Sequence, residues 1–232
     1  MINNLYQSFV SASTENKKLL AILIDPDDFD ITKTEQFLNK LPSETTHIFV
    51  GGSTVENGET KVTVASLKKY TSLPLILFPG DESHLTDIAD GLLFLSLLSG
   101  RNAEYLIGQQ VKAVSKLRKN SLEVISTGYI LIDGGNQSAV ERVSKTTPLS
   151  QDNIQAIVDT ALAGEYLGKK LIYLEAGSGA KFPVNPSVIK AVKNAITIPL
   201  LVGGGIRTEN KKQEVYKAGA DMVVMGTYFE NN

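Results

Sequence analysis

Short hydrophobic runs alternate with longer amphipathic stretches along the whole chain. The runs are mostly unbroken rather than alternating with polar residues, which is typical of strands buried on both faces of a parallel sheet. We predict strands at Leu19–Ile24, His47–Val50, Pro74–Phe78, Leu92–Leu97, Glu123–Ser126, Leu171–Leu174, Leu200–Val202 and Met222–Met225. We predict helices at Thr32–Leu41, Thr60–Tyr70, Ala103–Lys119, Gln151–Leu167, Pro186–Asn194 and Glu209–Lys217, with an N-terminal helix at about Ile2–Ser13. This regular alternation favours a closed α/β barrel of the TIM (β/α)₈ type over an open sheet.

Two connections depart from a regular barrel. The segment Gly80–Asp90, between the third and fourth strands, is too short for a crossover helix with its loops. We therefore predict a modified barrel in which this crossover helix is replaced by a loop or a single turn. Only Thr227–Asn232 follow the last strand, so we expect no eighth helix there, and we expect the N-terminal helix to cover part of the barrel.

Local signals mark several helix ends. Asn185 followed by Pro186 offers an N-cap and a proline at the first helical position. Ser150 is predicted to be the N-cap of the helix that starts at Gln151. Gly168 and Gly219 lie where the C-terminal turns of two helices are expected.

The composition narrows the class of protein. A chain of 232 residues, with 42% hydrophobic and 21% charged residues, fits one globular barrel domain over residues 1–232. The net charge is −2 and no basic stripe is present, which argues against a nucleic-acid partner. No hydrophobic run is long enough to span a membrane, and the N-terminus lacks the features of a signal peptide. The absence of cysteine fits a cytoplasmic protein and excludes disulfides and thiolate chemistry.

Residues that could bind a ligand or take part in catalysis follow five of the predicted strands. The carboxyl ends of barrel strands all lie at one mouth, where active sites of this fold are found. The segments concerned are Asp25-Pro26-Asp27-Asp28, Gly51-Gly52-Ser53-Thr54, Glu175-Ala176-Gly177-Ser178-Gly179-Ala180, Gly203-Gly204-Gly205-Ile206-Arg207 and Gly226-Thr227.

The glycine clusters after strands six, seven and eight predict a phosphate site. Glycine lets backbone N–H groups approach an anion closely and adopt positive φ, and these loops are the usual phosphate site of the fold. The alternative is that these glycines only form tight turns.

Asp25 and Ser53 are candidate ligands of Mg²⁺. A carboxylate and a hydroxyl are hard oxygen ligands, and Mg²⁺ often binds one or two carboxylates together with substrate phosphates. As alternatives, Asp25 could be a turn residue before Pro26, and Ser53 a solvated loop serine. Asp27 and Asp28 are interpreted as loop or capping residues.

Glu175 and Tyr173 are candidate catalytic residues. A glutamate in a buried strand needs a partner or a function, and Glu175 could bind a substrate hydroxyl or act as a general base. Tyr173 lies on the same side of the strand and could bind a substrate oxygen. The alternatives are an ion pair of Glu175 with a lysine and a core position for Tyr173.

Several other residues indicate a function less clearly. Arg207 could pair with a phosphate or cap a loop, and His47 and His84 are interpreted as structural or exposed. Three apolar residues near strand ends could line a groove, although core packing is the simpler interpretation for each: Phe78, Leu97 and Tyr129.

These motifs together resemble the geranylgeranylglyceryl phosphate synthase family, which includes the bacterial PcrB-like heptaprenylglyceryl phosphate synthases. The resemblance covers Leu19 to Thr227. It rests on four segments: Asp25-Pro26-Asp27, Gly51-Gly52-Ser53, Tyr173-Leu174-Glu175-Ala176-Gly177-Ser178-Gly179 and Val202-Gly203-Gly204-Gly205-Ile206-Arg207. The tyrosine-to-glycine run with the triple glycine is specific, whereas Asp-Pro-Asp alone is not.

The resemblance implies a prenyltransferase that joins sn-glycerol 1-phosphate to a polyprenyl diphosphate through an ether, with Mg²⁺, in lipid biosynthesis. Geranylgeranyl diphosphate is the expected donor. The resemblance assigns Asp25 and Ser53 to magnesium and Glu175 to the acceptor hydroxyl. It assigns the glycerol phosphate site to Tyr173, Leu174, Glu175, Ala176, Gly177, Ser178, Gly179, Gly203, Gly204, Gly226 and Thr227. It also implies a homo-oligomer and allows peripheral membrane contact through the prenyl product.

Two positions depart from the family pattern. PcrB-like members carry a lysine two residues before the aspartate, where this chain has Leu23, which places it nearer the archaeal-type branch. Gly226-Thr227 replaces a glycine–asparagine pair, and threonine still offers a backbone N–H and a hydroxyl.

Two other functions remain open from the residues alone. A phosphosugar isomerase or aldolase could use the same fold, but it would need a lysine or paired acid–base residues at strand ends, and no such lysine is found. A non-catalytic barrel that binds a phosphorylated ligand would keep the glycine clusters without needing Asp25.

Overall fold

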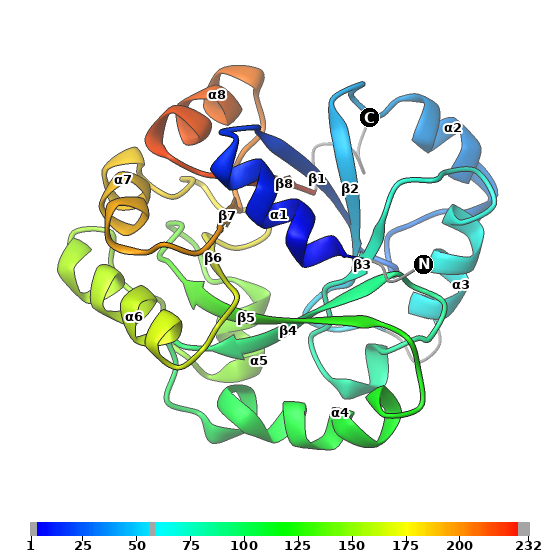
Figure 1. Ribbon diagram of the computed structural model, residues 1–232, viewed down its shortest axis with the longest axis horizontal. Coiled ribbons are helices and arrows are strands. Elements are labelled where there is room, and N and C mark those ends of the chain that lie inside the picture. Colours follow the sequence, from blue (N-terminus) through cyan, green and yellow to red (C-terminus); the bar gives the residue numbers. More distant parts are fainter. Residues whose placement is uncertain (1–3, 56–58, 227–232) are drawn as a thin grey trace.

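The computed structural model describes residues 4–55 and 59–226. Its strands form one closed parallel barrel in sequence order, surrounded by helices (Figure 1). The strands are β1 (Leu19–Ile24), β2 (Thr45–Val50), β3 (Leu75–Leu77), β4 (Gly91–Leu97), β5 (Glu123–Leu131), β6 (Leu171–Glu175), β7 (Leu200–Gly203) and β8 (Met222–Met225). The modified barrel predicted from the hydrophobic pattern is confirmed.

The helices follow the predicted alternation, with differences at their ends. They are α1 (Leu5–Thr14), α2 (Thr34–Asn39), α3 (Glu59–Leu67), α4 (Gln109–Leu117), α5 (Ala139–Ser144), α6 (Ile154–Tyr166), α7 (Pro186–Ala195) and α8 (Glu209–Ala218). Short 3₁₀ turns, η1 (Ile31–Lys33) and η2 (Glu82–His84), and a π-helical turn, η3 (Glu104–Gly108), complete the order. No helix of the described residues is both long enough and apolar enough to cross a lipid bilayer.

The strand side chains divide between two kinds of core, which explains why the hydrophobic runs are unbroken. In β1, Ala21 points into the barrel interior, while Leu20 and Ile22 pack against the surrounding helices. Successive side chains of a strand point to opposite faces, so a strand covered on both faces needs apolar residues at every position. The barrel closes where β1 pairs in parallel with both β2 and β8.

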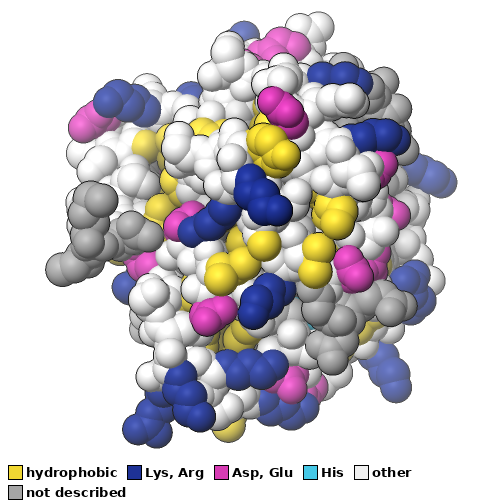
Figure 2. Space-filling model, turned by 90° about the vertical axis from the view of Figure 1, so that its right-hand side faces the viewer, with side chains coloured by type: hydrophobic (Ala, Val, Ile, Leu, Met, Phe, Trp, Pro, Cys, Tyr) yellow, Lys and Arg dark blue, Asp and Glu magenta, His cyan; other side chains and the backbone are white. Residues whose placement is uncertain are grey.

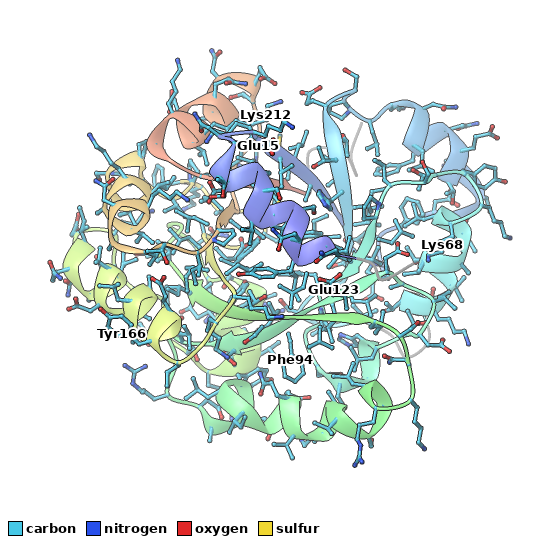
Figure 3. All side chains as sticks on the ribbon, in the orientation of Figure 1. Glu15, Lys68, Phe94, Glu123, Tyr166 and Lys212 are labelled. Atoms are coloured by element: carbon cyan, nitrogen blue, oxygen red, sulfur yellow. The ribbon has the colours of Figure 1, made fainter. Side chains whose placement is uncertain are left out.

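Helix α1 lies across one end of the barrel (Figure 1). Phe9 is buried there, with its ring 5.1 Å from the ring of His47 in β2. The Glu123 carboxylate, at the start of β5, accepts hydrogen bonds from the backbone N–H groups of Leu5 (2.6 Å) and Tyr6 (2.9 Å) (Figure 3). Thus α1 covers the barrel end, as expected, and its first turn is capped by a distant strand.

The connection between β3 and β4 contains only the turn η2, as the short segment predicted. His84 is buried in this turn, and its Nδ1 lies 3.2 Å from the backbone N–H of Gly80, which donates to it. The place that a crossover helix would take beside β3 and β4 is therefore occupied by a short loop.

Several predicted boundaries are wrong, and one helix was not predicted. Strand β5 continues to Leu131 rather than ending at Ser126, because Thr127 to Tyr129 pair with β4 and Thr127 to Leu131 pair with β6. Helix α6 begins at Ile154 rather than Gln151, because the Asn153 side chain caps it by accepting from the Ala156 N–H. Helix α5 was not predicted, because its six residues are too short to show a periodic pattern.

Figure 2 shows the face over α2 and α3. Lysine, arginine, aspartate and glutamate side chains are interspersed on this face, with hydrophobic side chains between them. Two exposed hydrophobic residues of this region are Ile31 in η1, directly before α2, and Val62 in α3. Charges of neither sign gather into one patch in this view.

Candidate active site

A cavity of about 210 Å³ opens at the carboxyl ends of the barrel strands. Five loops that the sequence singled out contribute to its wall, from β1, β2, β6, β7 and β8. The predicted residues that line the cavity are Asp25, Ser53, Tyr173, Glu175, Ser178, Gly179, Gly204 and Gly226. The tertiary structure therefore brings the candidate metal position and the candidate phosphate turns to one cavity.

The remaining predicted residues contribute differently. Leu174 and Ala176 direct their side chains into the core between the sheet and the helices, so only their backbone can serve the cavity. Gly177 and Gly203 do not line the cavity themselves, but each is next in sequence to a residue that does, Ser178 or Gly204. Thr227 lies outside the described residues.

The glycines of the β6 and β7 turns are needed for close packing around Glu175. A Cβ on Gly203 would lie 2.2 Å from the Tyr173 hydroxyl oxygen, and a Cβ on Gly204 would lie 2.4 Å from Glu175 Oε1. Gly204 also has φ +87°, which disfavours any side chain. The turn and the close approach of the Glu175 carboxylate therefore both require glycine at Gly204, whereas its part in binding a phosphate stays a prediction.

Glu175 ends β6 and is almost completely buried. Its Oε1 accepts a hydrogen bond from the Gly177 backbone N–H at 2.7 Å. Burial raises the pKa of the Glu175 carboxyl, and the Tyr173 hydroxyl and the Gly177 N–H oppose this by favouring the ionised form. Within the described residues no lysine forms an ion pair with Glu175, so the alternative of a purely structural ion pair at this position is not found.

Tyr173 is fully buried, and its ring stacks on Tyr129 with centroids 5.4 Å apart and planes at 5°. Burial raises the pKa of its phenol. The hydroxyl is close enough to affect the Glu175 carboxylate, but no described atom meets hydrogen-bond geometry with it. Since a buried hydroxyl without a partner is unfavourable, this group at the cavity wall is available for a ligand oxygen.

Asp25 follows β1 and is half-buried at the cavity wall. The pKa of its carboxyl is raised to about 6, mainly by desolvation; the hydrogen bond from the Asp27 backbone N–H opposes this shift, and the nearby carboxylates of Asp27 and Asp28 add to it. The turn after β2 packs tightly against it, because a Cβ on Gly52 would lie 2.6 Å from Asp25 Oδ2.

The residues around Asp25 fit a Mg²⁺ ion. Asp25 and Ser53 supply a carboxylate and a hydroxyl to the same cavity. A divalent cation would favour the ionised carboxylate, which burial and the neighbouring acids disfavour. No group of three or more histidine, aspartate or glutamate side chains in the described residues forms a complete metal cage. This donor set suits Mg²⁺, which takes other ligands from water and substrate phosphates.

A second, apolar cavity of about 100 Å³ adjoins the first. It extends sideways beneath η2, η3 and α4, where the loop replaces the crossover helix. The two cavities share five lining residues: Gly52, Ser53, Phe78, Tyr129 and Val140. Phe78, Leu97 and Tyr129 all line this space, so the groove interpretation, which the sequence made the weaker one, holds for them.

The sequence missed several lining residues. Val140 of α5 and Leu93 and Leu95 of β4 line the apolar cavity. The β4 residues look like ordinary core positions in the sequence, and only the missing helix leaves space beside them. Arg207 lines the polar cavity from the turn after β7.

Comparison with known proteins places the chain in a family. The model of the PcrB family matches residues 13–232. A geranylgeranylglyceryl phosphate synthase of Zunongwangia profunda is 58% identical over 224 residues, covering 97% of this chain and 96% of the relative. The protein of the same name from Pyrococcus furiosus is 40% identical, covering 97% of this chain and 90% of its own length.

Solved structures agree with this placement. The (S)-3-O-geranylgeranylglyceryl phosphate synthase of Thermoplasma acidophilum, in complex with its substrate sn-glycerol-1-phosphate, superposes with a TM-score of 0.90 at 34% identity, over 98% of this chain and 92% of that one. A tryptophan synthase α-subunit from Pyrococcus furiosus, at 13% identity and a TM-score of 0.56, shares the fold alone. The chain therefore belongs to the PcrB family and is a prenyltransferase of that family.

Proposed function

We propose that this chain transfers a polyprenyl group from a polyprenyl diphosphate, with geranylgeranyl diphosphate the expected donor, to the 3-hydroxyl of sn-glycerol 1-phosphate in a Mg²⁺-dependent reaction. The observation that carries the proposal is the junction of a polar, glycine-lined cavity with an apolar one through shared walls. The names of the PcrB relatives and the glycerol-1-phosphate complex of the Thermoplasma acidophilum protein support it.

The polar cavity suits the acceptor. Backbone N–H groups in turns with positive φ, such as those at Gly179 and Gly204, form concave surfaces that bind phosphate without a titrating group. Ser178 and Gly226 line the same cavity. Fixing the phosphate here orients the 3-hydroxyl of the acceptor toward Glu175.

Glu175 acts as the general base in the proposed reaction. The oxygen of the 3-hydroxyl forms a bond to the allylic carbon of the donor, the bond from that carbon to the diphosphate oxygen breaks, and the hydroxyl proton passes to Glu175. The raised pKa of this buried carboxyl makes it a better proton acceptor than an exposed glutamate. Tyr173 lines the same cavity, and its hydroxyl, which has hydrogen-bond geometry with none of the described atoms, can hold a substrate oxygen.

The donor diphosphate faces the side of the cavity that Asp25 and Ser53 line. These two residues would hold Mg²⁺, which supplies neutralisation of the charge that develops on the leaving diphosphate. The prenyl tail enters the apolar cavity, where each buried methylene contributes about 0.8 kcal/mol. Phe78 and Tyr129 separate the two cavities and shield the reacting carbon from water.

Substitution of Asp25 tests the proposal. The wild type, incubated with Mg²⁺, radiolabelled glycerol 1-phosphate and prenyl diphosphates of several lengths, should give a butanol-extractable product. Asp25→Asn should lower turnover on the order of 10²–10³-fold, because the charge on the leaving group is then less well neutralised. Binding of glycerol 1-phosphate, measured by calorimetry, should change little.

Asp27→Asn is the matched control, because Asp27 is exposed and does not line the cavity. Its turnover should stay near that of the wild type. Retained turnover in Asp25→Asn would contradict the metal role, and the absence of product with every donor would contradict the assignment as a whole.

A further inference from the structure

Helix α4 and the turn before it carry apolar side chains on the solvent side. Ile107, Val111 and Val114 are exposed to 59%, 64% and 44%. Their spacing of four and three residues places them in one stripe along the helix. We call these three residues the α4 stripe. Figure 1 shows α4 at the periphery of the molecule, with none of the described elements on its outer side.

The same helix is strongly basic. Residues 105–122 contain Lys112, Lys116, Arg118 and Lys119 and no aspartate or glutamate, in a chain of net charge −2. Lys112 pairs with Glu104, and the Lys116 ammonium donates to the Glu82 carbonyl oxygen at 2.8 Å. Arg118 and Lys119 are exposed at the end of the helix. Asp81 lies close enough to Lys112 and Lys116 to offset part of their charge. The positive charge of Arg118 and Lys119 stays exposed beside the α4 stripe, and it complements an anionic surface.

The inner side of the helix lines the apolar cavity. Gln110 and Ala113 are buried on this side, and both lie in the cavity wall together with Tyr105 of η3. One helix thus separates a cavity that suits a prenyl chain from an exposed surface that is apolar and cationic. Exposed apolar side chains together with lysine and arginine on one helix are the properties of helices that lie in the interface of an anionic bilayer.

We propose that the α4 stripe, with Lys116, Arg118 and Lys119, docks on the surface of an anionic phospholipid membrane. Docking brings the apolar cavity next to the acyl chains, so that a prenyl chain passes between bilayer and cavity without crossing bulk water. The inference rests on the proposed function for the ligand of the cavity, but the docking itself is a property of the outer surface and is measured separately.

Co-sedimentation of the full chain with lipid vesicles tests the docking. The wild type should bind vesicles of phosphatidylcholine with roughly 30% phosphatidylglycerol, should bind pure phosphatidylcholine weakly, and should be released by added salt. The double variant Ile107→Ser/Val111→Ser should lower the partition about tenfold or more, because exposed apolar area is lost. The triple variant Lys116→Gln/Arg118→Gln/Lys119→Gln should lower it on the order of 100-fold, because each cation near the surface adds to binding.

Val62→Ser is the matched control, since Val62 is also exposed to 44% but lies on α3, away from the α4 stripe. Its partition should equal that of the wild type. Thermal unfolding should be similar in all variants, because every substituted side chain is exposed. We call the double variant Ile107→Ser/Val111→Ser the stripe variant. If the wild type fails to bind anionic vesicles, or if the stripe variant binds as well as the Val62→Ser control, the inference is wrong.

Two further measurements distinguish membrane docking from the proposed catalytic function and from a contact between copies of the chain. Turnover with dispersed farnesyl diphosphate, without vesicles, should be equal in the wild type and the stripe variant. Vesicle binding without turnover by the wild type would contradict the proposed function and leave the docking surface standing. Light scattering gives the particle mass: if the stripe variant forms smaller particles and keeps its vesicle binding, the stripe is a contact between copies of the chain and the docking proposal is overturned.

Discussion

Glu175 combines a buried carboxylate with a fixed orientation. It ends β6, accepts the Gly177 N–H, and lies where only glycine at 204 leaves room for its oxygen. Both contacts involve Oε1, so they fix the orientation of the carboxyl group at the cavity wall. The proposed role as a base therefore follows from position as well as from the raised pKa.

The variant Glu175→Gln separates the effect of the position of this side chain from the effect of its ability to take a proton. The glutamine oxygen can still accept the Gly177 N–H but cannot take a proton, so kcat should fall about 10²–10⁴-fold while KM for glycerol 1-phosphate changes little. The kcat/KM of the wild type should decline in acid, through a pKa above that of an ordinary glutamate. Steady-state kinetics across pH check both results.

Stability gives an independent measurement on the same residue. A carboxyl whose pKa is raised on folding favours the native state at low pH, and this contribution is lost as the pH rises through the folded-state pKa. Glu175→Gln should therefore be more stable than the wild type at pH 8 and similar to it near pH 4. A variant that is less stable at pH 8 would show that the carboxylate is mainly structural.

At the scale of elements, α1 depends on a residue far from it in sequence. Its N-cap residue, Asn4, makes no side-chain capping hydrogen bond within the described residues, and the Glu123 carboxylate accepts from two first-turn N–H groups instead. A negative charge at this end also interacts favourably with the helix dipole. The cap therefore ties the helix that covers the barrel end to the start of β5.

Glu123→Ala should lower the free energy of unfolding by about 1–2 kcal/mol, because two N–H groups lose their acceptor and the dipole loses its charge. Amide hydrogen exchange should become faster in α1 before it changes in the barrel strands. Glu15→Gln is the control, since Glu15 is exposed at the far end of α1 and pairs only with Lys17 in the described residues (Figure 3). Equal exchange in both variants would contradict a capping role.

At the scale of the whole molecule, the end of the barrel beneath α1 holds a buried histidine. His47 packs against Phe9, and its Nδ1 lies 2.8 Å from the Thr46 hydroxyl oxygen. Burial lowers its pKa to about 4, so the native barrel holds it neutral. Because the ring is almost completely buried, its protonation disfavours the native state and is therefore coupled to unfolding.

The direction of the pH effect follows from this depressed pKa. The contribution of neutral His47 is fully present above the unfolded value of 6.5 and is lost as the pH falls toward about 4. The wild type should lose about 2–3 kcal/mol more between pH 7 and pH 4.5 than His47→Gln does, in urea unfolding at both pH values. Equal losses would show that other groups, and not His47, cause the acid sensitivity.

The hydrophobic pattern alone determined the barrel and much of its mouth. The bounds predicted for β1 and β8 match the structure, because unbroken apolar runs flanked by polar residues are local signals. The glycine-rich turns and Asp25 could be assigned to one mouth, since all parallel strands of a barrel end at the same side. Asn185 caps α7 as its Asn-Pro signal predicted.

Only the tertiary structure decided the features that depend on distant partners. Gly128 belongs to β5 because β4 and β6 pair with it, although glycine does not favour a strand. Glu123 caps a helix more than a hundred residues away, and the apolar cavity beside Leu93 exists because a neighbouring helix is absent. A local sequence pattern records the preference of a segment, whereas pairing, capping and empty space are properties of what the closed barrel places next to it.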